Sequence, residues 1–130
     1  MMQLDTSKRK YSLSFLTIAD VSPVEAIKIA AQCGYANVGL RLLPAAPNES
    51  EYPILHDKQL IKETQAVLDD TGVEVADVEI IRITPDFQPK QYLHFLETAQ
   101  KLNAKHILIA GNDHETNRLI HNYALFCEQS

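Results

Sequence analysis

Two patterns of hydrophobic residues alternate along the chain, one with the two-residue period of a β-strand and one with the spacing of an α-helix. The two-residue period predicts strands over residues 11–18, 36–42, 73–84 and 105–110. Helical spacing follows each strand and predicts helices over residues 23–33, 57–71, 90–102 and 114–128. Because right-handed crossovers place successive strands parallel, this order predicts an α/β fold with a parallel sheet.

The residues at the helix ends support this division. Ser22, Pro23 and Glu25 match a capping box, in which the serine alone stabilises the helix start by about 1 kcal/mol. The first three helical segments end at residues that tolerate a left-handed backbone: Gly34, Gly72 and Asn103. The chain is expected to form a single domain over residues 1–130, of which residues 1–10 lack any pattern and are expected to be flexible.

The strand at 73–84 has two faces of different chemistry. Asp77 and Glu79 share one face with Ile81, whereas Val78 and Ile80 share the other. Helices on both sides of an open parallel sheet would require both faces to be apolar. In a (βα)8 TIM barrel only the outer face packs on helices, and the inner face turns polar where sites are built. The pattern therefore predicts four consecutive βα units that form half of such a barrel.

The strand at 36–42 repeats this pattern and carries Arg41 on its polar face. The residues expected on the inner wall of the barrel are Ser14, Arg41, Glu79 and His106. Arg41 and Glu79 lie on adjacent strands at similar depth and can pair. Two interpretations stay open: the pair orients hydroxyl or phosphate oxygens of a substrate, or it is a structural ion pair that adds little net stability. Arg82 has the opposite parity and is expected at the surface or between strands.

The carboxyl ends of the strands are where a barrel assembles its site. A long loop is expected there over residues 43–52. Asn112 and Asp113 follow the fourth strand at the same end, but Asn-Asp before a helix is also ordinary capping chemistry, and we favour that interpretation. His106 begins its strand at the opposite end, so a hydrogen-bonded structural histidine is expected there rather than a general base.

Composition and charge narrow the classes of partner. The formal net charge is -5 and basic residues are dispersed apart from positions 8–10, so binding to nucleic acid or to an anionic membrane surface is not expected. No hydrophobic run approaches the roughly 20 residues of a membrane span, and no signal peptide is recognisable. Cys33 and Cys127 form no CxxC pair and no disulfide framework. The expected location is the cytoplasm.

The histidines do not form a metal-binding motif. The five histidines are spread over several predicted elements without zinc-like spacing. The nearest local pattern is HETNR at residues 114–118, which has Arg118 where a zinc-binding helix needs its second histidine. No metal site is therefore expected from this chain alone.

The stretch from Tyr11 through Asp113 resembles the first half of a xylose-isomerase-like TIM barrel of the sugar phosphate isomerase/epimerase type. The resemblance lies in YSLSFLTIADVSPVEAIKIAAQCGYANVGLRLLPAAP, DVEIIRITPD and HILIAGND. It implies a metal-dependent barrel that moves a proton between adjacent carbons of a sugar or related polyol. It also implies that two glutamates, one aspartate and one histidine from strands five to eight hold a divalent metal such as Mn or Mg.

A full barrel of this type needs eight strands and typically about 250 residues. The resemblance therefore implies that this chain is the N-terminal half, that the metal ligands lie outside it, and that it is inactive alone. Glu79 is the best candidate for a catalytic carboxylate. The residues expected to bind a sugar or sugar phosphate are Arg41, Glu79, Asn112 and Asp113.

The main alternative is a non-enzymatic half-barrel. Open edges at the first and last strands favour association, so a second copy or a complementary half-barrel is expected to close the barrel. A nuclease of the endonuclease IV kind would need zinc-binding histidines at the ends of the third and fourth strands, where this chain has Glu79 and Asn112-Asp113. A flavodoxin-like sheet would need a phosphate-binding glycine loop after the first strand, which is missing.

Overall fold

The computed structural model describes residues 9–46, 48 and 53–130. Residues 1–8 of the expected flexible end, and residues 47 and 49–52 of the loop expected over 43–52, lie outside the described residues. The strands are β1 (Ser12–Leu13), β2 (Asn37–Arg41), β3 (Glu74–Ile83) and β4 (His106–Gly111). The α-helices are α1 (Pro23–Gln32), α2 (Lys58–Thr71), α3 (Leu93–Lys101) and α4 (Thr116–Gln129). The 3-10 helices are η2 (Phe15–Ile18), η3 (Pro53–Leu55) and η4 (Pro89–Tyr92).

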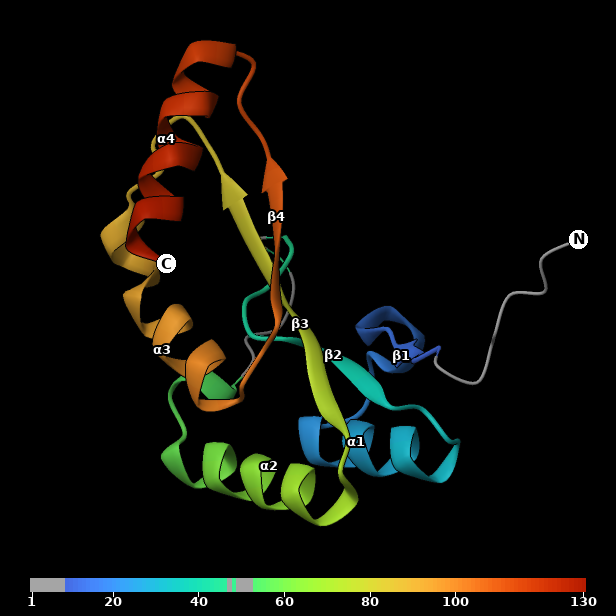
Figure 1. Ribbon diagram of the computed structural model, residues 1–130. Helices are drawn as coiled ribbons and strands as arrows, with labels where there is room; N and C mark the ends of the chain where they lie inside the picture. The colour runs from blue at the N-terminus through green and yellow to red at the C-terminus, as the bar shows by residue number, and fades with distance from the viewer. Residues whose placement is uncertain (1–8, 47, 49–52) are drawn as a thin grey trace, which may run out of the picture.

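The four strands form one parallel sheet in the order β1-β2-β3-β4. All four α-helices lie on one side of this sheet (Figure 1), and we call the opposite side the helix-free face. The predicted α/β fold of four βα units is confirmed, and it is consistent with half of a (βα)8 barrel. Within the described chain, β1 and β4 each have one edge without a partner strand.

The helix ends follow the predicted residues. The Ser22 hydroxyl accepts a hydrogen bond from the backbone N–H of Glu25 at 3.2 Å and so caps α1. Positive φ angles of 82°, 74° and 53° occur at Gly34, Gly72 and Asn103. These left-handed residues follow α1, α2 and α3, as the sequence predicted.

An irregularity in β3 changes which of its residues face the helices. Val78 pairs with Ile107 and Ile81 pairs with Ile109, so three steps along β3 match two along β4. Ile107 and Ile109 line a groove with residues of α3 and α4. Val78 and Ile81 therefore share the helix-covered face, and both are fully buried there.

This shift overturns the simple alternation predicted for β3. Ile81 does not share a face with Asp77 and Glu79, because the extra residue reverses the alternation beyond Glu79. The same reversal brings Arg82, the register partner of Ala110, to the helix-free face. Arg82 is exposed, as predicted, but on the face that also carries the two acids.

β1 is shorter than predicted. Its pairing with β2 covers only Ser12 and Leu13, and η2 replaces the rest of the predicted strand. The ring of Phe15 is buried, and its centroid lies 4.3 Å from Cζ of Arg41. These two residues are far apart in the sequence, so the local alternation of residues does not encode their contact. Ser14 precedes η2 and is exposed, so it does not belong to the strand that was predicted to carry it.

The last two helices also start later than predicted. Residues 89–92 form η4, so α3 begins at Leu93. α4 begins at Thr116 because the carboxylate of Glu115 caps it, accepting from the backbone N–H groups of Asn117 and Arg118 at 3.2 and 2.6 Å. Phe126 anchors α4 through ring contacts with Phe87 and Tyr92. Two hydrophobic positions that helped to predict this helix are more than 45% exposed: Ile120 and Tyr123.

Candidate functional site

An ion pair lies on the helix-free face at the carboxyl end of β2. Arg41, the last residue of β2, is in register with Glu79 of β3. Glu79 Oε1 accepts a hydrogen bond from Arg41 Nε at 2.9 Å and lies 2.6 Å from Arg41 Nη2. The two side chains are only 8% and 9% exposed. The predicted pairing of these residues is confirmed.

The sheet itself sets the direction of this pair. Leu40 and Val78, the residues just before Arg41 and Glu79, are in register and belong to the hydrophobic core. Because successive side chains of a strand point to opposite faces, Arg41 and Glu79 must point away from that core. The Phe15 ring covers the guanidinium on this side. Among the described residues, Phe15 of η2 thus contributes to the burial of the pair.

Asp77 is a second acid on the helix-free face. It is in register with Gly39 of β2 and His106 of β4. A Cβ atom at Gly39 would lie 2.9 Å from Asp77 Oδ1, so the missing side chain makes room for the carboxylate. Burial raises the pKa of Asp77, the negative charge of Glu79 raises it further, and His106 acts in the opposite direction.

Asp77 was not predicted as a site residue, although the sequence contains a signal for it. It has the same parity as Glu79, and the strand before it carries a glycine on its polar face. The sequence does not reveal that Gly39 and Asp77 are in register, which is what brings the carboxylate over the glycine. We call Arg41, Asp77 and Glu79 the polar wall.

His106 begins β4 on the helix-free face, as predicted, but it is exposed. No hydrogen bond joins its ring to another residue of the described ranges. The structural role expected of His106 therefore has no hydrogen-bond partner within the described residues and stays a prediction.

Charges at the amino ends of the strands neutralise one another. Glu74 at the start of β3 pairs with Lys105, and Lys10 Nζ lies 3.9 Å from its other side-chain oxygen. The hydrogen bond and charge of Lys105 lower the pKa of Glu74, and Lys10 adds to this effect. This end of the sheet is thus held by exposed structural ion pairs, whereas the polar wall lies farther along the strands.

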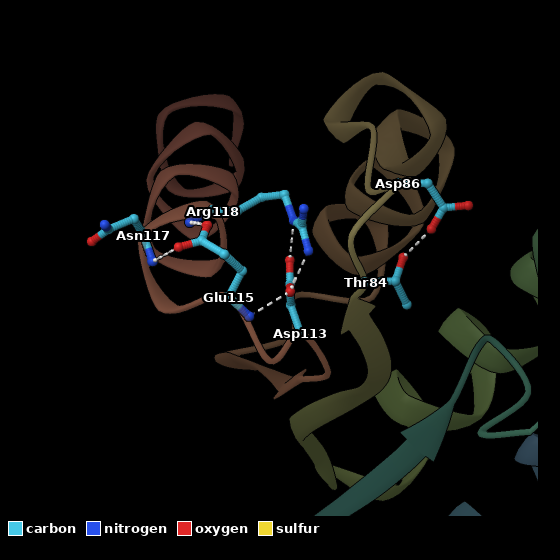
Figure 2. A network of polar contacts seen from close by, with 6 residues as sticks. All are labelled: Thr84, Asp86, Asp113, Glu115, Asn117 and Arg118. Atoms are coloured by element: carbon cyan, nitrogen blue, oxygen red, sulfur yellow. Dashed lines mark hydrogen bonds and ion pairs between the residues drawn. The ribbon is translucent and has the colours of Figure 1, made fainter.

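Asp113 holds the turn between β4 and α4 (Figure 2). Its Oδ2 accepts from Arg118 Nε at 2.6 Å, and its Oδ1 accepts from Arg118 Nη2 at 2.8 Å and from the backbone N–H of Glu115 at 2.9 Å. The hydrogen bonds from Arg118 lower the pKa of Asp113 to about 2. Asn112 is exposed, and its backbone N–H donates to the Ile83 carbonyl at 2.9 Å.

This geometry supports the structural interpretation of Asp113. Both carboxylate oxygens are already engaged within the turn, and the residue that caps α4 is Glu115. The capping role expected of Asn112 and Asp113 therefore belongs to Glu115, because the turn extends farther than the sequence indicates. Substrate binding by Asn112 and Asp113 stays a prediction.

The described residues do not fit the divalent metal that the resemblance implies. Within them, no three His, Cys, Asp or Glu side chains come together in a way that could hold a metal ion. On the polar wall, the guanidinium of Arg41 already supplies the positive charge beside Glu79. The polar wall itself offers groups that can bind oxygen atoms and exchange protons through its carboxyl groups.

The comparisons with known proteins do not assign the chain to a family. No known protein family matches the chain, and no curated protein sequence matches it. The resemblance to xylose-isomerase-like barrels thus stays a prediction. Among the helices of the described ranges, none is long and apolar enough to cross a membrane.

Proposed function

We propose that this chain is the substrate-facing half of a sugar isomerase/epimerase-like barrel, which becomes active when a second half completes it. The observation that carries the proposal is the buried Arg41–Glu79 pair on the helix-free face of a parallel βα sheet. The inner face at the carboxyl ends of the strands is where (βα)8 enzymes build their sites. A buried arginine and carboxylate at that place suit a substrate rich in hydroxyl oxygens.

Each member of the polar wall has a role in this proposal. Moving a proton between adjacent carbons requires a group that removes the proton and a group that protonates the neighbouring position. Glu79 is the proposed base, and Asp77, whose pKa is raised by burial, is the proposed acid. Arg41 orients substrate oxygens through its planar donors while its Nε donates a hydrogen bond to Glu79.

Proton transfer can be tested directly by deuterium incorporation. The chain is incubated in D2O with pentoses, hexoses and their phosphate esters, and ¹H NMR follows the hydrogen on the carbon next to the carbonyl group. The wild-type protein, in its associated form, should replace this hydrogen with deuterium. Glu79→Gln should slow the exchange by about 100-fold or more, the contribution typical of a general base.

The matched control is Glu128→Gln, which makes the same change at an exposed position of α4. It should exchange deuterium at the wild-type rate. Absence of exchange for every sugar, or equal rates for Glu79→Gln and the wild type, would contradict the proposed function.

A second candidate is a non-enzymatic half-barrel that self-associates. The observation in its favour is that β1 and β4 have open edges and that an open groove of about 690 Å³ borders β4. Its walls include Leu93, Ile107 and Phe126, of which Leu93 is 48% exposed. Association of the chain without any deuterium exchange would favour this candidate over the enzyme.

A further inference from the structure

A pocket lies beyond the carboxyl end of β2, next to the polar wall. It has a volume of about 310 Å³ and is lined by residues 43–46, Ile80, Arg82 and Tyr92. The irregularity in β3 gives Arg82 this position, because simple alternation would have turned the side chain to the opposite face. The volume is at the lower end of the range for small-ligand sites.

The backbone holds the guanidinium of Arg82 in place. Arg82 Nε donates a hydrogen bond to the carbonyl oxygen of Ala45 at 2.7 Å. This contact fixes the orientation of the planar group and uses one of its five N–H donors. Within the described ranges, no other hydrogen bond or ion pair engages Arg82, so its terminal amino groups are available to a ligand.

Tyr92 supplies the second polar side chain of the pocket. Its ring stacks on Phe87, with 5.1 Å between the ring centroids, so the position of the phenol is fixed. Burial and the nearby charge of Asp86 raise the pKa of Tyr92 above its ordinary value, and the hydroxyl therefore remains protonated as a donor. All other lining residues are apolar, and no carboxylate is among them.

We propose that this pocket binds the phosphate group of a phosphorylated sugar, with Arg82 as the main contact and the Tyr92 hydroxyl as a second donor. An arginine with free amino groups binds the oxygens of a phosphate in a fork, with two parallel N–H···O hydrogen bonds. The inference rests on the proposed function and narrows its substrate from sugars in general to sugar phosphates. Arg82 lies three positions after Glu79 along the chain, a span of at most about 11 Å that a phosphorylated sugar can bridge.

Isothermal titration tests the pocket without requiring turnover. D-ribose 5-phosphate, D-ribose, inorganic phosphate and D-gluconate are titrated into the wild type, Arg82→Gln and the control Arg9→Gln, which removes the same charge at an exposed position. We expect D-ribose 5-phosphate to bind the wild type and Arg9→Gln equally, and to bind Arg82→Gln at least tenfold more weakly. D-ribose should bind at least tenfold more weakly than its phosphate ester, and inorganic phosphate should compete with that ester.

Several results would overturn the inference. These are equal binding of D-ribose 5-phosphate to Arg82→Gln and the wild type, equal binding of D-ribose and its phosphate, and no saturable binding of the phosphate ester. Equal binding of D-gluconate would assign the pocket to a carboxylate instead. Circular dichroism and thermal unfolding of Arg82→Gln establish that it is folded, and Arg82→Lys, which keeps the charge without the fork, should bind at an intermediate level.

The outcome is separable from that of the proposed function. Arg82-dependent phosphate binding without deuterium exchange in any sugar would support the pocket and contradict the isomerase. Exchange in phosphorylated sugars at a rate and an apparent affinity that Arg82→Gln leaves unchanged would support the isomerase and overturn the phosphate pocket.

Discussion

At the scale of single residues, the buried carboxylate of Glu79 is paired with the guanidinium of Arg41. Arg41→Met keeps most of the side-chain length but leaves the buried carboxylate without its cation. We expect the free energy of unfolding to fall by about 3–5 kcal/mol, the usual cost of breaking a buried pair from one side. Urea unfolding followed by circular dichroism measures this change.

The double variant Arg41→Met/Glu79→Gln is the control for this reading of the pair. It should recover most of the lost stability, because no uncompensated charge remains. A loss of less than about 1 kcal/mol in Arg41→Met would contradict the account, because the pair would then behave like one on an open surface.

The lowered pKa of Asp113 predicts that the free energy of unfolding decreases as the pH falls. Arg118 lowers the pKa of Asp113 from 3.8 to about 2 in the folded chain. An acid with a lowered folded-state pKa stabilises the fold above its ordinary pKa, and this contribution disappears as the pH falls through the folded value. Between about pH 4 and pH 2 the wild type should therefore lose stability more steeply than Asp113→Asn. Unfolding curves at a series of pH values test this, and parallel slopes would refute it.

At the scale of secondary-structure elements, two serines at helix starts differ in their contacts. Ser22 accepts a hydrogen bond from the N–H of Glu25, whereas the side chain of Ser14 makes no capping bond to η2. Ser22→Ala should lower the stability by about 1 kcal/mol. Ser14→Ala is the matched control and should change it by less than about 0.5 kcal/mol. Equal effects in chemical unfolding would show that capping does not explain the start of α1.

The start of α1 and the ends of the first three α-helices were predictable because their causes are local. Ser22, Gly34, Gly72 and Asn103 act through their own side chains or backbone angles, and the structure uses them as expected. The end of β1 was not predictable, because it depends on the contact of Phe15 with Arg41, 26 positions away (41 − 15). Local alternation cannot encode such a contact.

The same reasoning explains which parts of the candidate site could be predicted. The pairing of Arg41 with Glu79 followed from parity on adjacent strands. The positions of Ile81 and Arg82 did not, because the extra residue in β3 appears only when its register with β4 is known. The sequence therefore did not predict the pocket around Arg82.

At the scale of the whole molecule, the proposed closure of the barrel depends on the helix-free face and on the open edges of β1 and β4 in the described chain. Leu108 of β4 lies between Ile107 and Ile109, which face the helices, so its side chain is on the helix-free face, 47% exposed. A lysine there has access to water in a single half-barrel, and Leu108→Lys should change the stability of a single chain by less than about 0.5 kcal/mol. In a closed barrel the same lysine would be enclosed, and closure would become unfavourable.

The most direct test of the half-barrel is the molecular mass in sedimentation equilibrium over a range of protein concentrations. We predict that the wild type has twice the mass of one chain, that Leu108→Lys has the mass of one chain, and that Ala66→Lys, which adds the same charge on the exposed side of α2, behaves as the wild type. A wild type that stays a single chain at every concentration, or a Leu108→Lys variant that associates as the wild type does, would contradict closure of the barrel by a second copy.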